Sequence, residues 1–168
     1  MKELKPISQT AIPKALDRAI QYRLLNEPWQ AESICLDILA VNPDHQQAII
    51  VLVLAITDQF ESTQGNHRKS EAMALIQRLD SAYHKLYYTG IIVERQGMAA
   101  LKRNSPRGQY IAYDGLIEAL EFYKNAQEVH PDNNEDSILR WNACVRMIEQ
   151  FQLKPSPESI GENAFTDM

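Results

Sequence analysis

Residues 48–56 read AIIVLVLAI, an unbroken run of nine apolar side chains. The run is too short to cross a lipid bilayer, because a membrane-spanning helix needs roughly 20 residues. It also lacks the alternation of apolar and polar residues that marks a strand exposed on one face. A helix that is apolar on every side has to be covered on every side. We therefore expect this stretch to be the central helix of an all-α protein, with the other helices packed around it.

The composition is that of an ordinary soluble globular protein. The 168 residues are 45% hydrophobic and 23% charged, which fits a single domain with its own core. The net charge of −5 argues against nucleic-acid and membrane partners, because binders of either gain affinity by neutralising phosphates. The first residues, MKELKPISQTAIP, contain no apolar run of the kind found in signal peptides. We expect a cytoplasmic protein.

The sequence contains no recognisable catalytic, metal-binding or phosphate-binding motif. It contains no HExxH, no CxxC and no glycine-rich phosphate loop. Asp80 and His84 have the i, i+4 spacing of metal ligands on a helix, but no third ligand accompanies them. The two cysteines, Cys35 and Cys144, stand among apolar neighbours and are expected to be reduced core residues. The sequence therefore predicts no catalytic residues, no metal and no cofactor.

Apolar residues at spacings of three and four predict seven helices. These cover residues 13–25, 28–41, 45–60, 69–79, 83–102, 110–129 and 135–151. Residues 1–12 are expected to be a flexible lead, residues 13–151 the helical domain, and residues 152–168 a disordered tail.

Several local signals set the helix boundaries. Pro13 and Pro28 fit first turns, where a missing N–H costs nothing, and Asp44 is a candidate N-cap for the central helix. Asp132, Asn133 or Asn134 is expected to cap the last helix. We also predict a break at Asp80 or Ser81, between the fourth and fifth helices.

The sequence makes a specific prediction about the packing of two residues, Gly90 and Trp29. Gly90 stands inside the fifth helix at a cost of roughly 1 kcal/mol relative to alanine, which a close helix crossing would explain. Trp29 is assigned to the inward stripe of the helix at 28–41.

Residues 12–45 resemble one tetratricopeptide (TPR) unit, which has a period of 34 residues. Ala19 and Ala31 match the small positions of the two helices, Tyr22 matches the aromatic position, and Pro43 matches the proline that closes the unit. Ile38 departs from the pattern, because the family usually has a small residue there. Small residues let two helix backbones approach where they cross, and the proline forces the turn into the next unit.

A second match is the sequence ALEFYKNA at residues 119–126, followed by Pro131. It looks like the second helix of a TPR unit, whose first helix would carry Gly90 at the small position. The unit between the two matches is looser, and the bulky Val53 stands where a small residue is expected. The resemblance covers roughly residues 12–150. It implies a right-handed superhelix of antiparallel helix pairs, with about three units and a closing helix.

The resemblance also implies a function, because TPR arrays bind peptides on the concave surface made by the first helix of each pair. The chain would then be a non-enzymatic protein–protein interaction module that binds a partner segment. By the register of the family, that face carries Leu16, Ile20, Arg23, Ile50, Leu54, Tyr87, Ile91 and Glu94. Arg140 and Trp141 are added because arginine and tryptophan often anchor interfaces. The carboxylate clamp of chaperone-binding TPR proteins is not expected, since Ile20 and Leu54 replace its asparagines.

Other uses of this face stay open at the level of sequence. The apolar face is expected to be covered by a partner, by a second copy in a homodimer, or by the chain's own residues 135–151 and tail, with Phe165. An enzyme that uses Tyr88, Glu94 and Arg140 is a further, weaker alternative. Arg140 is otherwise expected to pair along its own helix with Asp136 or Glu149.

Overall fold

The computed structural model describes residues 1–62 and 67–158. Within these ranges the chain forms seven α-helices, a short 3₁₀ helix and no strand, so the predicted all-α class is confirmed. The chain divides into two compact units, Met1–Tyr88 and Thr89–Met168, and each is described by itself. None of the described helices combines the length and the apolar character that crossing a membrane requires.

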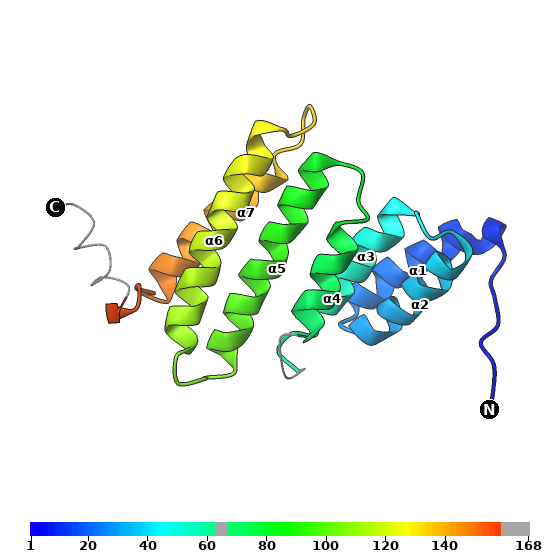
Figure 1. The fold of residues 1–168 in the computed structure, drawn as a ribbon, viewed down its shortest axis with the longest axis horizontal. Coiled ribbons are helices and arrows are strands. Elements are labelled where there is room, and N and C mark those ends of the chain that lie inside the picture. Colours follow the sequence, from blue (N-terminus) through cyan, green and yellow to red (C-terminus); the bar gives the residue numbers. More distant parts are fainter. Residues whose placement is uncertain (63–66, 159–168) are drawn as a thin grey trace. The chain divides into compact units, whose positions relative to one another are not determined.

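The described part of the first unit contains a short 3₁₀ helix, four α-helices and the beginning of a fifth α-helix. They are η1 (Gln9–Ala11), α1 (Ile12–Leu24), α2 (Pro28–Val41), α3 (Gln46–Thr57), α4 (His67–Ile76) and the start of α5 (Ala82–Lys102). Neighbouring helices pack in chain order, α1 on α2, α2 on α3 and α3 on α4, and α1 also contacts α3 (Figure 1).

The apolar run at residues 48–56 is the core of this unit, as the sequence predicts. All of its side chains are buried apart from Leu54, which keeps partial exposure. Ala19 and Ala31 are completely buried, on α1 and α2. Their methyl groups are small enough for the two packed helices to approach closely.

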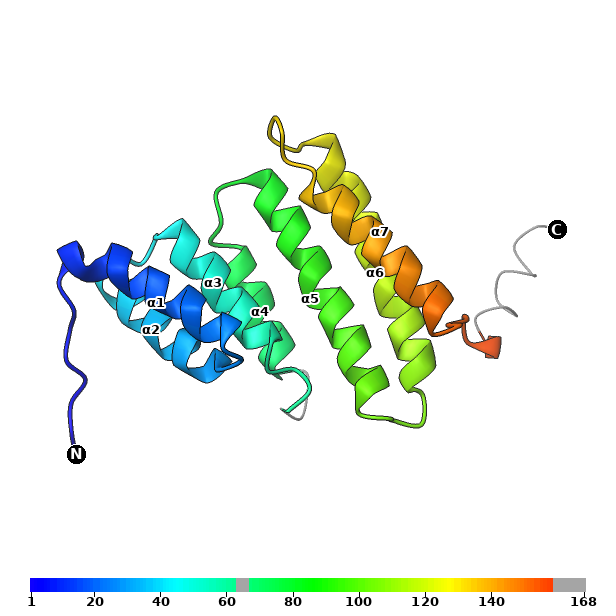
Figure 2. The ribbon, with the colours of Figure 1, turned by 180° about the vertical axis from the view of Figure 1, so that it is seen from behind.

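The second unit contains the rest of α5, α6 (Gly108–Glu128) and α7 (Asp136–Gln150), and α6 packs on α7 (Figure 2). The contact of α5 with α6 depends on glycine. A Cβ atom on Gly90 would lie 2.6 Å from Cε1 of Tyr123, and one on Gly97 would lie 3.3 Å from the backbone of Ala112. The predicted close crossing at Gly90 is confirmed.

The helix boundaries agree with the prediction apart from small shifts and two caps. The break between α4 and α5 is present at residues 77–81. The N-cap of α3 is His45 rather than Asp44, because His45 has the extended backbone of a cap and its Nδ1 accepts the N–H of Ala48 at 3.2 Å. The N-cap of α7 is Glu135, and the Asn134 side chain accepts the N–H of Asp136 at 3.0 Å.

Part of the predicted tail packs on the second unit. Leu153 and Ser156 are buried. The Arg107 guanidinium donates to Oγ of Ser156 at 3.4 Å and to a carboxylate oxygen of Glu158 at 3.1 Å. Phe165, the tail residue that could help to cover the apolar face, lies outside the described residues.

Candidate interaction surface

The predicted binding face of the first unit is formed by α1 and α3. Leu16, Ile20 and Arg23 follow one another at i, i+4 and i+7 and therefore share one side of α1. Leu54 stands one turn before Asp58, the C-cap of α3. We call the surface of Leu16, Ile20, Arg23 and Leu54 the α1–α3 face.

An ion pair joins the two helices at the end of this face. Nε of Arg23 donates to Oδ2 of Asp58 at 2.7 Å, and Nη2 donates to Oδ1 at 3.2 Å. The side chains of Arg23 and Asp58 are 20% and 22% exposed. A guanidinium that bonds both oxygens of a carboxylate fixes orientation as well as distance. The pair therefore holds the Arg23 side of α1 against the Asp58 end of α3.

The predicted site residues of the first unit differ in accessibility. Leu16, Ile20 and Leu54 are partly exposed, whereas Ile50 is buried at 3% exposure. Ile50 therefore belongs to the core and not to an accessible face. Tyr87 is partly exposed on the first part of α5, where its ring stacks on Tyr83 at a centroid distance of 5.6 Å.

In the second unit, the predicted residues Glu94 and Arg140 form an ion pair, with Glu94 buried and Arg140 partly exposed. The Glu94 carboxylate is 5% exposed, and it accepts hydrogen bonds from the Tyr123 hydroxyl at 2.6 Å and from Nε of Arg140 at 3.2 Å. Nη2 of Arg140 reaches the other Glu94 oxygen. The thiol of Cys144 donates to Glu94 at 3.6 Å. Arg140 thus pairs with Glu94 on α5, and not with Asp136 or Glu149 on its own helix as the sequence analysis expected.

The groups around Glu94 stay protonated. Burial raises the pKa of the Tyr123 hydroxyl and of the Cys144 thiol, and the negative charge of Glu94 raises both further. A neutral phenol and a neutral thiol donate hydrogen bonds and are poor nucleophiles. The cluster therefore solvates a buried carboxylate. Ile91 is buried on the same helix, while Trp141, next to Arg140 on α7, is partly exposed.

The prediction for Trp29 is wrong. Its side chain is 60% exposed, although the sequence pattern assigned it to the inward stripe. The buried residues of α2 include Ala31, Cys35 and Ile38. Trp29 stands two positions before Ala31, a rotation of about 200° around the helix, and so points away from the core.

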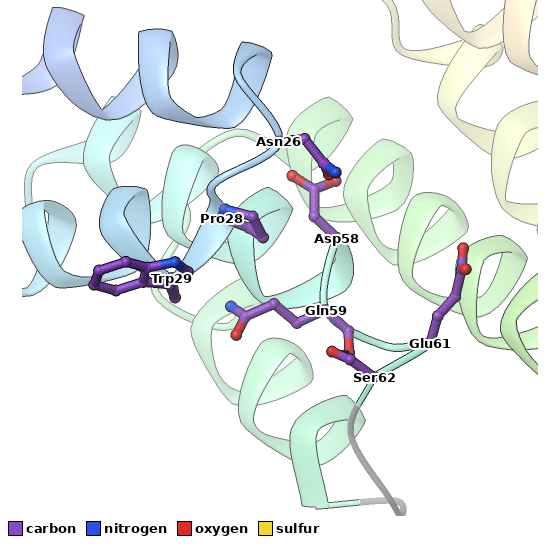
Figure 3. A pocket seen from close by; sticks show the side chains of 7 residues that line it. All are labelled: Asn26, Pro28, Trp29, Asp58, Gln59, Glu61 and Ser62. Atoms are coloured by element: carbon purple, nitrogen blue, oxygen red, sulfur yellow. Dashed lines mark hydrogen bonds between the residues drawn. The ribbon is translucent and has the colours of Figure 1, made fainter.

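A polar pocket of about 410 Å³ opens beside Trp29 (Figure 3). It is lined by Asn26, Pro28, Trp29, Asp58, Gln59, Glu61 and Ser62. These residues come from the turn between α1 and α2, the start of α2 and the segment after α3. Sequence reasoning missed this pocket, because its residues are adjacent only after α2 has packed on α3. In the described ranges, no group of three or more His, Cys, Asp or Glu side chains is placed to hold a metal ion.

Comparison with known proteins gives no match: no family model fits the sequence, and neither a curated protein nor a solved structure shows significant similarity to the chain.

Proposed function

We propose that the chain is a non-enzymatic protein-interaction module on a TPR-like scaffold, which binds a segment of a partner protein on the α1–α3 face. The observation that carries this proposal is the partial exposure of Leu16, Ile20 and Leu54 beside the Arg23–Asp58 ion pair. Leu54 is the one residue of the apolar run at 48–56 that is not buried. Apolar side chains grouped on an accessible face are typical of binding surfaces.

The helix spacing supports the TPR-like part of the proposal. Helix α3 begins at Gln46, 34 residues after α1 begins at Ile12, which is the period of the family. The next interval is slightly longer, because α5 begins at Ala82, 36 residues after Gln46. The small residues of the two best matches are all completely buried, namely Ala19, Ala31, Ala119 and Ala126. A superhelix of antiparallel pairs is part of the proposal.

The chemistry of the interior favours binding over catalysis. Glu94 and Arg140 are the charged residues of the weaker enzyme alternative, and they are bonded to each other. A cytoplasmic location is also proposed, because Cys35 and Cys144 are free thiols and reduced cysteines are usual in that compartment.

Site-specific photocrosslinking in the native host tests the function. A photoreactive phenylalanine analogue at Leu54 or Ile20 is expected to give a discrete crosslinked product with another protein. The same analogue at Leu139, which is 63% exposed on α7, is the control and should not give that product.

A second experiment introduces a charged side chain at Leu54 and measures capture of the partner. Leu54→Asp is expected to abolish capture of the crosslinked partner, with the helical circular dichroism unchanged, while Leu139→Asp retains it. If both positions crosslink alike, or if the captured species is a second copy of the chain, the proposed function fails.

A further inference from the structure

The outward side of α2 carries a row of exposed side chains with little polarity. Trp29, Ser33, Leu36 and Ala40 are all exposed and follow one another at i, i+4, i+7 and i+11. At about 100° per residue, this spacing keeps the four positions within about 60° around the helix axis. The Trp29 and Leu36 side chains are 60% and 53% exposed. We call these four residues the α2 outer stripe, and their spacing is that of a seam along which one helix packs on another.

The α2 outer stripe is complementary to itself when a second α2 runs in the opposite direction. Large and small side chains alternate along it, and the midpoint between Trp29 and Ala40 is also the midpoint between Ser33 and Leu36. A two-fold axis through this common midpoint places Trp29 against Ala40 of a second copy, and Leu36 against Ser33 of that copy. Each large side chain then faces a small one, as the packing of knobs into holes between two helices requires.

The polar residues beside the stripe are compatible with this arrangement. A two-fold axis brings the same flank of both helices together, so Asp37 lies near Gln30 of the second copy. The side chains of Gln30 and Asp37 have no hydrogen bond or ion pair with any other described residue. An amide NH₂ group can therefore donate to the Asp37 carboxylate across the seam. On the other flank, Glu32 is bonded by Arg68 at 2.7 Å, which balances its charge within its own copy.

We infer that the chain forms a two-fold symmetric dimer, in which the α2 outer stripes of two copies pack antiparallel on each other. An interface made mainly by one helix of each copy is small compared with the roughly 1,600 Å² of standard interfaces, so we expect a dissociation constant of about 10–100 μM. The inference does not depend on the proposed function, because it uses none of the residues of the α1–α3 face.

Sedimentation equilibrium of the full chain tests this inference. Between about 5 and 500 μM protein, the mass is expected to rise from that of a monomer to that of a dimer. Trp29→Ala and Leu36→Glu should each weaken the dimer by about tenfold or more, because each removes an anchor from both halves of the symmetric interface. Circular dichroism should report an unchanged fold, since both residues are exposed.

A pair of opposite charges tests the antiparallel register. Ser33→Lys and Leu36→Glu, each made alone, should weaken the dimer. The double variant Ser33→Lys/Leu36→Glu should associate more tightly than Leu36→Glu, because the introduced lysine of one copy then faces the introduced glutamate of the other. In a parallel dimer equal positions would meet, so the double variant would be weaker than either single one. A double variant that does not recover would therefore overturn the antiparallel arrangement.

The remaining outcomes separate this inference from the proposed function. Leu139→Glu, at an exposed position of α7, is the matched control and should leave the dimer unchanged. A chain that stays monomeric over the whole concentration range would overturn the α2 dimer and leave the α1–α3 face as proposed. A dimer that Leu54→Asp dissociates and Leu36→Glu leaves intact would overturn both, because a second copy would then occupy the α1–α3 face.

Discussion

The hydroxyl of Tyr123 donates a hydrogen bond of 2.6 Å to the carboxylate of Glu94, deep in the second unit. The ring of the same tyrosine fills the space that a side chain at residue 90 would need. One aromatic residue thus supplies both a donor for a buried charge and the surface against which a glycine packs.

Tyr123→Phe is expected to destabilise the protein by about 1–3 kcal/mol, because it removes a donor from a buried carboxylate and leaves the apolar ring in place. Urea unfolding followed by circular dichroism measures the change. Tyr113→Phe, which deletes the same atom from a partly exposed residue of α6, is the control and should have a much smaller effect. Equal losses for the two variants would show that Glu94 does not depend on the hydroxyl.

Arg140→Met should cost about 3 kcal/mol of unfolding free energy, because it leaves the Glu94 charge buried without its cation. We take the lower end of the range for broken buried pairs, since the Arg140 side chain is 30% exposed. Glu94→Gln in the Arg140→Met background should restore part of the loss, as the unpaired charge is then gone. A double variant no more stable than Arg140→Met alone would contradict this account.

Gly90→Ala is expected to destabilise the protein by about 1–3 kcal/mol, although alanine is the better helix former. The reason is steric, because the new Cβ would lie 2.6 Å from the Tyr123 ring. Thermal and urea unfolding measure the effect. In a Tyr123→Val background the ring is absent, and the same glycine substitution should be neutral or stabilising. A penalty that persists there would point to another neighbour.

Ala119→Leu should cost about 1–3 kcal/mol by overpacking, because Ala119 is completely buried in α6. Glu118→Leu, at the exposed position one residue earlier, is the matched control and should change the melting temperature little. An unchanged melting temperature for Ala119→Leu would mean that the small residue is not required there.

Burial of the Cys35 thiol raises its pKa from 9.0 to about 12, with a smaller contribution from the charge of Glu32 and an opposing one from Arg23. The unfolded chain releases this proton near pH 9, while the folded chain retains it up to about pH 12. The stability associated with the protonated thiol is therefore complete below pH 9 and is lost as the pH rises from 9 to 12. A Cys35→Ala variant should lose less stability over the same range in urea unfolding. A thiol reagent at pH 8 should leave native Cys35 unmodified, and rapid modification would contradict its burial.

The local signals of this sequence were reliable for the helices. A run that is apolar on every side, such as residues 48–56, is readily explained only as a helix covered by other helices. Pro28 and Pro43 mark the beginning and the end of α2, because proline restricts the backbone. Gly90 indicated a close crossing, because a glycine inside a helix is unfavourable unless another group needs the space.

The candidate sites were predicted less well. Trp29 was placed inward because it is apolar, but its position around α2 relative to Ala31 and Cys35 directs it to solvent. Glu94 and Arg140 were assigned to a binding surface, and the structure instead joins them as an ion pair in which Glu94 is buried and Arg140 partly exposed. A residue's type does not say whether its charge is paired across 46 positions of sequence.

The sequence by itself determined the helical class, the helix boundaries to within a few residues and the buried character of residues 48–56. These depend on interactions between residues a few positions apart, through backbone sterics and the 3.6-residue period. Only the tertiary structure decided that Arg23 pairs with Asp58, that Tyr123 and Arg140 enclose Glu94, and that Trp29 borders a pocket with Asp58 and Glu61. Each of these arrangements joins residues far apart in the chain, and their distances are set by how whole helices pack.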